Sequence, residues 1–160
     1  MSWNGRDVPR VLLIGYGNDL RRDDGVGVFV AKQLEEHAPT WTVIVARQLL
    51  PEHAEQVAEA DLVVFIDAAV DVEAGTVRWT KVLPAPHAQL HAHRLDPPGL
   101  IALAGEALGR APSACWLVRI GAASLDLGES LSPVVAAAAR RVVKRIPQVI
   151  RSEVQSVTHA

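Results

Sequence analysis

The sequence predicts an α/β protein, a three-layer α/β/α sandwich around a twisted, mainly parallel five-stranded sheet. Two observations lead to this fold class. Short apolar runs alternate with amphipathic stretches along most of the chain, which is typical of parallel sheets covered by helices. The run Leu62–Ile66 contains only apolar residues, as expected of a central strand that is buried on both faces. No internal repeat or linker interrupts this order.

Each predicted element follows from a local pattern. Val11–Ile14 is apolar and mostly branched, which indicates a short buried strand, and Gly15 and Gly17 then allow a sharp turn. From Asp24 the apolar side chains recur at helical spacing, and Pro39 stops this helix near residue 37. The same reasoning predicts further strands at 41–46, 62–66, 77–83 and 114–120. The strand at 77–83 is more polar, so we expect it toward an edge of the sheet.

Capping residues predict the boundaries of the later helices. Pro51 is suited to the first position of a short helix, and Asp96 precedes two prolines that begin another, which Gly109 ends. Ser132 and Pro133 begin the final helix, which Pro147 is expected to close. We expect one domain over 1–160, with 1–9 and 151–160 loose at its ends.

Composition excludes several classes of function. A chain of 160 residues with 49% apolar residues is expected to form one domain with a sizeable core. The net charge of -2 gives no electrostatic reason to bind nucleic acid. The single cysteine, Cys115, lies in an apolar strand, which favours a buried structural thiol. Without a signal sequence or a long apolar run, we expect a cytoplasmic protein that does not enter a membrane.

The stretch Gly15–Gly27 forms a strand, glycine turn and helix, which is the arrangement of a phosphate cradle. A dinucleotide site requires a third glycine where this chain has Leu20. Asp23 and Asp24 also occupy the helix N-terminus, where their charges would repel a phosphate. One of these aspartates could cap the helix. The other would be free to bind a metal or a proton.

Candidate ligands stand at the expected carboxyl ends of two strands and in one loop. Asp24 follows the first strand, and Asp67 directly follows the apolar run 62–66, although it could also brace a neighbouring loop. His87, His91 and His93 gather in a loop before a helix, although they could also be surface histidines. Carboxylates and imidazoles make a mixed oxygen and nitrogen site, which nickel accepts. No serine lies in a nucleophile-elbow motif.

Several of these segments resemble the hydrogenase maturation endopeptidases, which remove a C-terminal extension from the large subunit of nickel-iron hydrogenases. Gly15–Gly27 is similar to the opening motif of that family. Phe65–Ala68 and His93–Pro97 are similar to the segments that carry its aspartate and its histidine. Gly121–Pro133 is similar to its closing segment. The resemblance covers roughly residues 10 to 147.

The resemblance implies a function and a set of site residues. It implies that Asp24 and Asp67 are catalytic, and that Asp24, Asp67 and His93 bind nickel. The nickel would be supplied by the hydrogenase large-subunit precursor, the expected partner, rather than held permanently. Some members have glutamate where this chain has Asp24, and His91 is a second candidate for the histidine ligand. We expect the protein to act as a monomer.

Two mechanisms and two other functions remain open from the sequence. The metal could polarise the scissile carbonyl, or a carboxylate could activate water while the nickel is only recognised. The first alternative function is a non-catalytic, nickel-sensing factor for hydrogenase assembly with the same fold. The second is a nucleotide-binding α/β module, which Leu20 and the paired aspartates disfavour.

Overall fold

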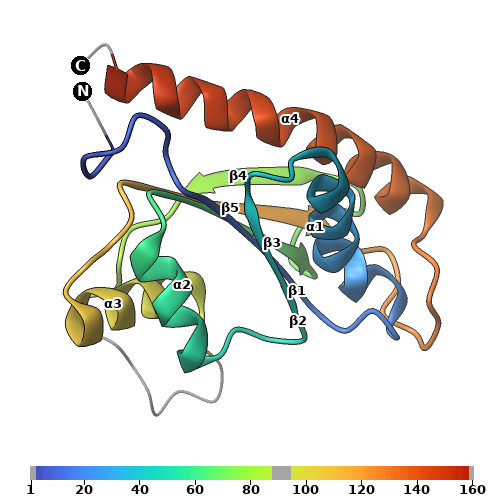
Figure 1. Ribbon diagram of the computed structural model, residues 1–160. Coiled ribbons are helices and arrows are strands. Elements are labelled where there is room, and N and C mark those ends of the chain that lie inside the picture. The colour runs from blue at the N-terminus through green and yellow to red at the C-terminus, as the bar shows by residue number, and fades with distance from the viewer. Residues whose placement is uncertain (1–2, 88–94, 159–160) are drawn as a thin grey trace.

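The sheet has the predicted architecture. The computed structural model describes residues 3–87 and 95–158. Within them, a five-stranded sheet has the order β2-β1-β3-β5-β4 (Figure 1). Its strands are β1 (Val11–Tyr16), β2 (Thr42–Ala46), β3 (Leu62–Ala69), β4 (Val77–Lys81) and β5 (Ala114–Gly121). All neighbouring pairs are parallel except β4 with β5, which is antiparallel. The predicted α/β fold is confirmed, and the polar strand β4 lies at an edge.

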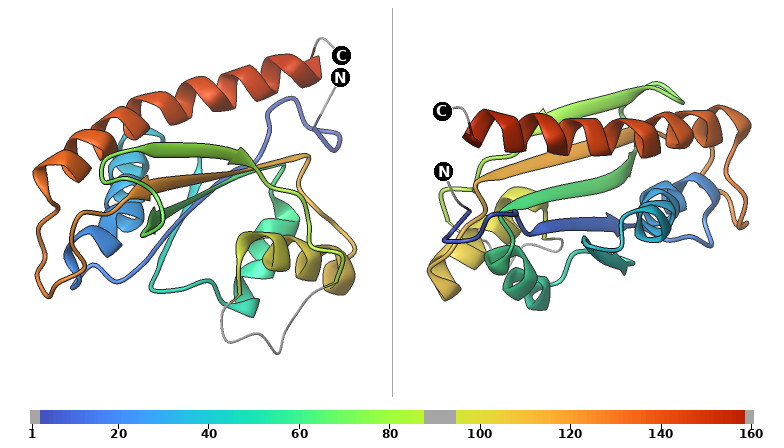
Figure 2. Two further views of the ribbon diagram at one scale, coloured as in Figure 1. Left: turned by 180° about the vertical axis from the view of Figure 1, so that it is seen from behind. Right: turned by 45° about the horizontal axis from the view of Figure 1, so that its top comes forward.

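Helices cover both faces of the sheet, which completes the three layers. The helices α1 (Val26–His37) and α4 (Pro133–Thr158) pack together on one face, and α2 (Ala54–Glu59) and α3 (Pro97–Leu108) on the other (Figures 1 and 2). Two short 3-10 helices, η1 (Arg22–Gly25) and η2 (Pro51–His53), precede α1 and α2. None of these described helices is long and apolar enough to cross a membrane.

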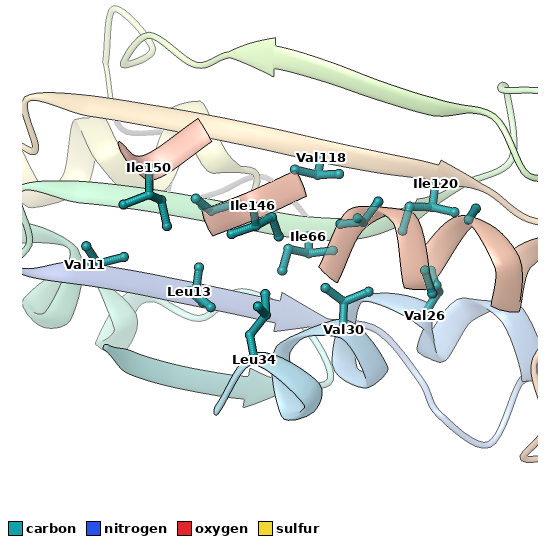
Figure 3. Close-up of a cluster of buried hydrophobic side chains, with 14 of the residues drawn as sticks. Val11, Leu13, Val26, Val30, Leu34, Ile66, Val118, Ile120, Ile146 and Ile150 are labelled. Carbon is teal, nitrogen blue, oxygen red and sulfur yellow. The ribbon is translucent and has the colours of Figure 1, made fainter. Parts of the chain in front are cut away.

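The core has two halves, one on each face of the sheet, because side chains along each strand point alternately to the two faces. On the side of α1 and α4, Leu13 and Ile66 pack with Ile146 (Figure 3). On the side of α2 and α3, Ile14 and Phe65 pack in a second cluster. Successive residues of a strand point to opposite faces, so β1 and β3 contribute to both clusters. Burying each such side chain stabilises the fold by about 1.5–3 kcal/mol.

Capping confirms the predicted start and end of α3. The side chain of Asp96 accepts a hydrogen bond from the Gly99 N–H at 2.9 Å, as an N-cap residue does. At the other end, Gly109 takes the left-handed conformation with φ of 71°. These two residues therefore set the length of the helix locally.

The predicted end of the final helix is wrong, because α4 continues through Pro147 to Thr158. Proline removes one helical hydrogen bond, but Ile146 and Ile150 lie on either side of it in the same buried stripe. Beyond it, Glu153 accepts a hydrogen bond from the Trp116 indole N–H at 2.9 Å and pairs with Lys81 at 2.9 Å. Tertiary contacts therefore hold residues 151–158, which we expected to be loose.

The expectation of a loose N-terminal segment is also wrong for residues 3–9. The side chain of Trp3 is only 4% exposed and packs into the core. Asp61, buried before β3, accepts hydrogen bonds from Asn4 Nδ2 at 2.8 Å and from the Arg10 N–H at 2.7 Å. Arg6 forms an ion pair with the same carboxylate at 2.6 Å. The buried charge of Asp61 therefore fastens this segment beside the sheet.

Candidate active site

Asp24 lies in η1, at the turn that follows β1. Its Oδ2 accepts a hydrogen bond from the Asn18 N–H at 2.7 Å. The turn passes so closely that a side chain at Gly17, which has a φ of 140°, would lie 2.0 Å from the Asp24 carbonyl oxygen. Only glycine fits there, because both the space and the backbone conformation exclude a Cβ atom. The glycine turn therefore fixes the partly buried Asp24 carboxylate at the carboxyl end of β1.

Asp67 is partly buried near the carboxyl end of β3, and the strand continues through it to Ala69 instead of ending at Ile66 as predicted. Burial, and to a smaller extent the negative charge of Asp24, raise the pKa of this carboxyl, and the net result of all its interactions is a pKa of about 6. Hydrogen bonds from the Ala68 N–H and the Tyr16 hydroxyl, together with the charge of Arg119, act in the opposite direction. The group is therefore poised to gain or lose a proton near neutral pH.

The two carboxylates belong to one site because α1 approaches the sheet closely. A Cβ atom at Gly27 would lie 2.2 Å from the carbonyl oxygen of Ile66, the residue before Asp67. Only glycine allows the start of α1 to rest on the end of β3 at this distance. Since β1 and β3 are neighbouring parallel strands, this contact places the Asp24 turn beside Asp67. The electrostatic effect of Asp24 on the pKa of Asp67 follows from this arrangement.

Asp23 has a different role from the two that the sequence suggested for the aspartate pair. Neither Asp23 nor Asp24 caps a helix, because the N-cap residues of η1 and α1 are Arg21 and Gly25. Asp23 is fully buried and points toward the closing segment 121–133. It accepts four hydrogen bonds, from the N–H groups of residues 123, 124 and 132 at 2.7–2.9 Å and from the Ser132 hydroxyl at 2.7 Å.

These hydrogen bonds decide the ionisation of Asp23. Burial alone would raise the pKa of this carboxyl, but the donors from Ser132, Ser124 and Ala123 outweigh burial and hold it below its usual value. The carboxylate is therefore charged and fully paired. It joins the turn that carries Asp24 to the closing segment, two parts of the chain about a hundred residues apart.

The histidine loop is described only in part. His91 and His93 fall within 88–94, outside the described residues. His87 is exposed, and its Nδ1 lies 4.0 Å from Glu106 at the far end of α3. Within 3–87 and 95–158, no group of three or more His, Cys, Asp or Glu side chains is arranged to hold a metal. The nickel site remains a prediction from the sequence.

The residues that follow this loop lie near the carboxylates. Asp96, the N-cap of α3, is close enough to Tyr16 for its charge to contribute to the raised pKa of that phenol, although burial and Asp67 contribute more. Tyr16 in turn donates a hydrogen bond to Asp67. The described start of α3 therefore approaches the site from the side of Tyr16.

Sequence reasoning missed two residues of this site, Tyr16 and Arg119. Arg119 is the register partner of Asp67 on β5, and it forms two hydrogen bonds with the exposed Asp71. Both residues follow, two positions later on their strands, an apolar side chain that packs in the core beneath α2 and α3. A charged or phenolic residue at such a position was the signal that could have indicated them.

Cys115 is a buried thiol, as predicted. It belongs to the core between the sheet and the helices α2 and α3. Burial raises its pKa to about 12, so the reactive thiolate is not formed at neutral pH. This thiol has no part in the chemistry of the site.

Comparisons with known proteins show which solved structures share this fold. No model of a protein family matches the sequence, and no curated protein matches it. Solved structures do match. The [NiFe] hydrogenase maturation protease HycI from Thermococcus kodakarensis KOD1 has 26% identity and a TM-score of 0.70, over 89% of this chain and 93% of that chain. HybD from the same organism has 25% identity and a TM-score of 0.64, over 88% and 98%.

A third structure extends the likeness to bacteria. The hydrogenase maturating endopeptidase HybD from E. coli shares the fold with a TM-score of 0.69 at 22% identity, over 90% of this chain and 93% of that chain. The two structures from Thermococcus kodakarensis are hydrogenase maturation proteases, and this chain is a peptidase with the same α/β fold. The resemblance seen in the sequence is confirmed, because the chain is similar to hydrogenase maturation proteases over 88–89% of its length.

Replacing Asp23 by asparagine is expected to reduce stability in a pH-dependent way. Because the native pKa of Asp23 is lowered, its charged form stabilises the fold fully above its unfolded pKa of about 4. That contribution is lost as the pH falls through the native pKa. Asp23→Asn should therefore cost about 2–3 kcal/mol at pH 7 and progressively less in acid, measured by urea unfolding. Asp19→Asn, in the exposed part of the same turn, is the control. An equal loss at every pH would contradict this account.

Replacing Asp24 by asparagine is expected to lower the pKa of Asp67. The mutation removes a negative charge that raises this pKa, but burial, the larger cause, remains. The pKa should fall below about 6 while staying above its ordinary value of about 3.9. The titration of the Asp67 carboxyl carbon by NMR measures it, and Asp126→Asn in the closing segment is the control. An unchanged pKa would show that the two carboxylates do not share one site.

Proposed function

We propose that this peptidase removes the C-terminal extension of a nickel-iron hydrogenase large-subunit precursor after nickel insertion. The observation that carries the proposal is the pairing of Asp24 with Asp67 at the ends of two neighbouring strands. Two carboxylates with different environments can divide the work of accepting and returning a proton during hydrolysis of a peptide bond. The hydrogenase maturation proteases that share this fold support the choice of substrate.

The same carboxylates are suited to recognise nickel in the precursor. Asp24, Asp67 and His93 supply oxygen and nitrogen donors, which nickel accepts. His93 lies three residues before Asp96, which begins α3 near Tyr16. This set of ligands contains no thiolate and is too small to close a metal site by itself. The nickel therefore comes with the substrate, and its own ligands there complete the coordination.

Such a shared site makes nickel the signal for cleavage. The binding energy of Asp24, Asp67 and His93 is available only when the precursor already carries the metal. A precursor without nickel would not be held against the carboxylates in the geometry that hydrolysis requires. The chain thus cleaves after metal insertion and not before it.

The proposal is tested with the precursor in two forms. The purified protein should shorten nickel-loaded precursor and leave metal-free precursor intact, as measured by mass spectrometry of the precursor before and after incubation. Asp67→Asn is the control, since it keeps the size of the side chain but cannot take a proton. Equal cleavage of both forms would show that the peptide alone is recognised. No cleavage of either form would favour a nickel-sensing assembly factor.

The two histidines are distinguished by single substitutions. We expect His93→Ala to abolish processing of nickel-loaded precursor, because it removes the only imidazole of the proposed ligand set. His91→Ala should retain much of the activity and serves as the matched control, since it lies two residues away in the sequence. Rates of product formation measure both variants. The reverse pattern would assign the ligand to His91.

A further inference from the structure

Three polar side chains form a row across the sheet at the site. Along β1, β3 and β5, Tyr16, Asp67 and Arg119 each stand two positions beyond a side chain packed in the core beneath α2 and α3. Since strand residues alternate between faces, all three point to the same face. Asp67 and Arg119 are direct register partners, so their Cα atoms lie about one strand spacing, ~4.8 Å, apart.

The guanidinium of Arg119 is fixed and still accessible. Its NH1 and NH2 groups donate to the two carboxylate oxygens of Asp71 at 3.3 and 2.5 Å, an arrangement that holds the planar group in one orientation. Its side chain is nevertheless 33% exposed. Two of the five N–H groups of an arginine satisfy Asp71, so others remain to donate to a substrate.

This positive charge stands beside the carboxylates rather than apart from them. The charge of Arg119 lowers the pKa of Asp67, and it also acts on the Tyr16 phenol. A cation beside a general base can stabilise the negative charge that develops on a peptide carbonyl under attack. Asp71, whose side chain is 65% exposed, orients the guanidinium through this ion pair.

We propose that Arg119 binds the carbonyl oxygen of the scissile peptide bond and stabilises the oxyanion that forms there. The inference rests on the proposed function and names a further catalytic residue for it. Water forms a bond to the carbonyl carbon as its proton passes to a carboxylate of the pair. The carbonyl π electrons move onto the oxygen, which accepts hydrogen bonds from Arg119. The electron pair on this oxygen then re-forms the carbonyl double bond. The C–N bond breaks at the same time, and the carboxylic acid returns its proton to the leaving nitrogen.

The test is steady-state cleavage of nickel-loaded precursor by Arg119→Ala. Removing one donor to an oxyanion lowers kcat by about 100-fold or more, whereas KM should change little. Added guanidinium ion should restore part of the lost rate, because it can occupy the space that the side chain leaves. A residue with only a structural role would not respond in this way. Arg78→Ala is the matched control, because Arg78 is the exposed register partner of Arg119 on β4.

Two further variants distinguish a loss of catalysis from a loss of folding. Arg119→Lys retains the charge and should fold even where Arg119→Ala does not, but its point charge cannot reproduce the fixed fork, so kcat should again fall. Asp71→Ala leaves the guanidinium in place without its support and should lower kcat less than Arg119→Ala. Folding of each variant is checked by circular dichroism and urea unfolding.

The outcomes separate this inference from the proposed function. Normal cleavage by the wild type with kcat of the Arg119 variants within a few fold would overturn the inference alone. A rise in KM with unchanged kcat, or no rescue by guanidinium, would also overturn it. Failure of the wild type to cleave nickel-loaded precursor would overturn the proposed function and the inference with it.

Discussion

The rest of the site depends on the hydrogen bonds between the buried carboxylate of Asp23 and the closing segment 121–133. An ionised group taken out of water is costly unless it is fully paired, and here four donors meet it. Three of the donors are backbone N–H groups of the closing segment 121–133, so the charge is paired only when that segment lies against η1. The same bonds hold the neighbouring Asp24 in place, because the two residues share one short 3-10 turn. The hydrogen bonds that pair Asp23 thus also position the carboxylate of Asp24, the next residue.

The sheet supplies the other half of the site. The chain leaves β1 toward the face covered by α1, whereas the strand beside it, β3, leads on to β4 and then α3 on the opposite face. In open α/β sheets, ligands bind at such a switch point, and here Asp24 follows β1 while Asp67 lies near the carboxyl end of β3. Gly27 lets α1 approach close enough to bring them together. Tyr16, Asp67 and Arg119 then place a phenol, an acid and a cation side by side on one face of the sheet.

Local patterns predicted the strands, the main helices and their caps because those depend on neighbouring residues. Apolar runs located β1, β3 and β5, and Asp96 and Gly109 set the ends of α3 as expected. The errors arose where distant contacts outweighed a local preference. Pro147 would end a helix in isolation, but the apolar stripe continues beyond it and Glu153 is bound by two other elements. In the same way Asp61 holds the N-terminal segment, which has no regular pattern of its own.

The sequence by itself determined that acidic residues follow the apolar runs of the first and third strands, because Asp24 comes after the glycine turn and Asp67 directly follows the run 62–66. It also carried the resemblance to a family of peptidases. Only the tertiary structure decided which of the adjacent aspartates is buried and which faces the site, since that choice depends on donors about a hundred residues away. It likewise revealed Tyr16 and Arg119, which become neighbours of Asp67 through strand order and register. Strand order is set by how helices pack over the whole sheet, and no local pattern encodes it.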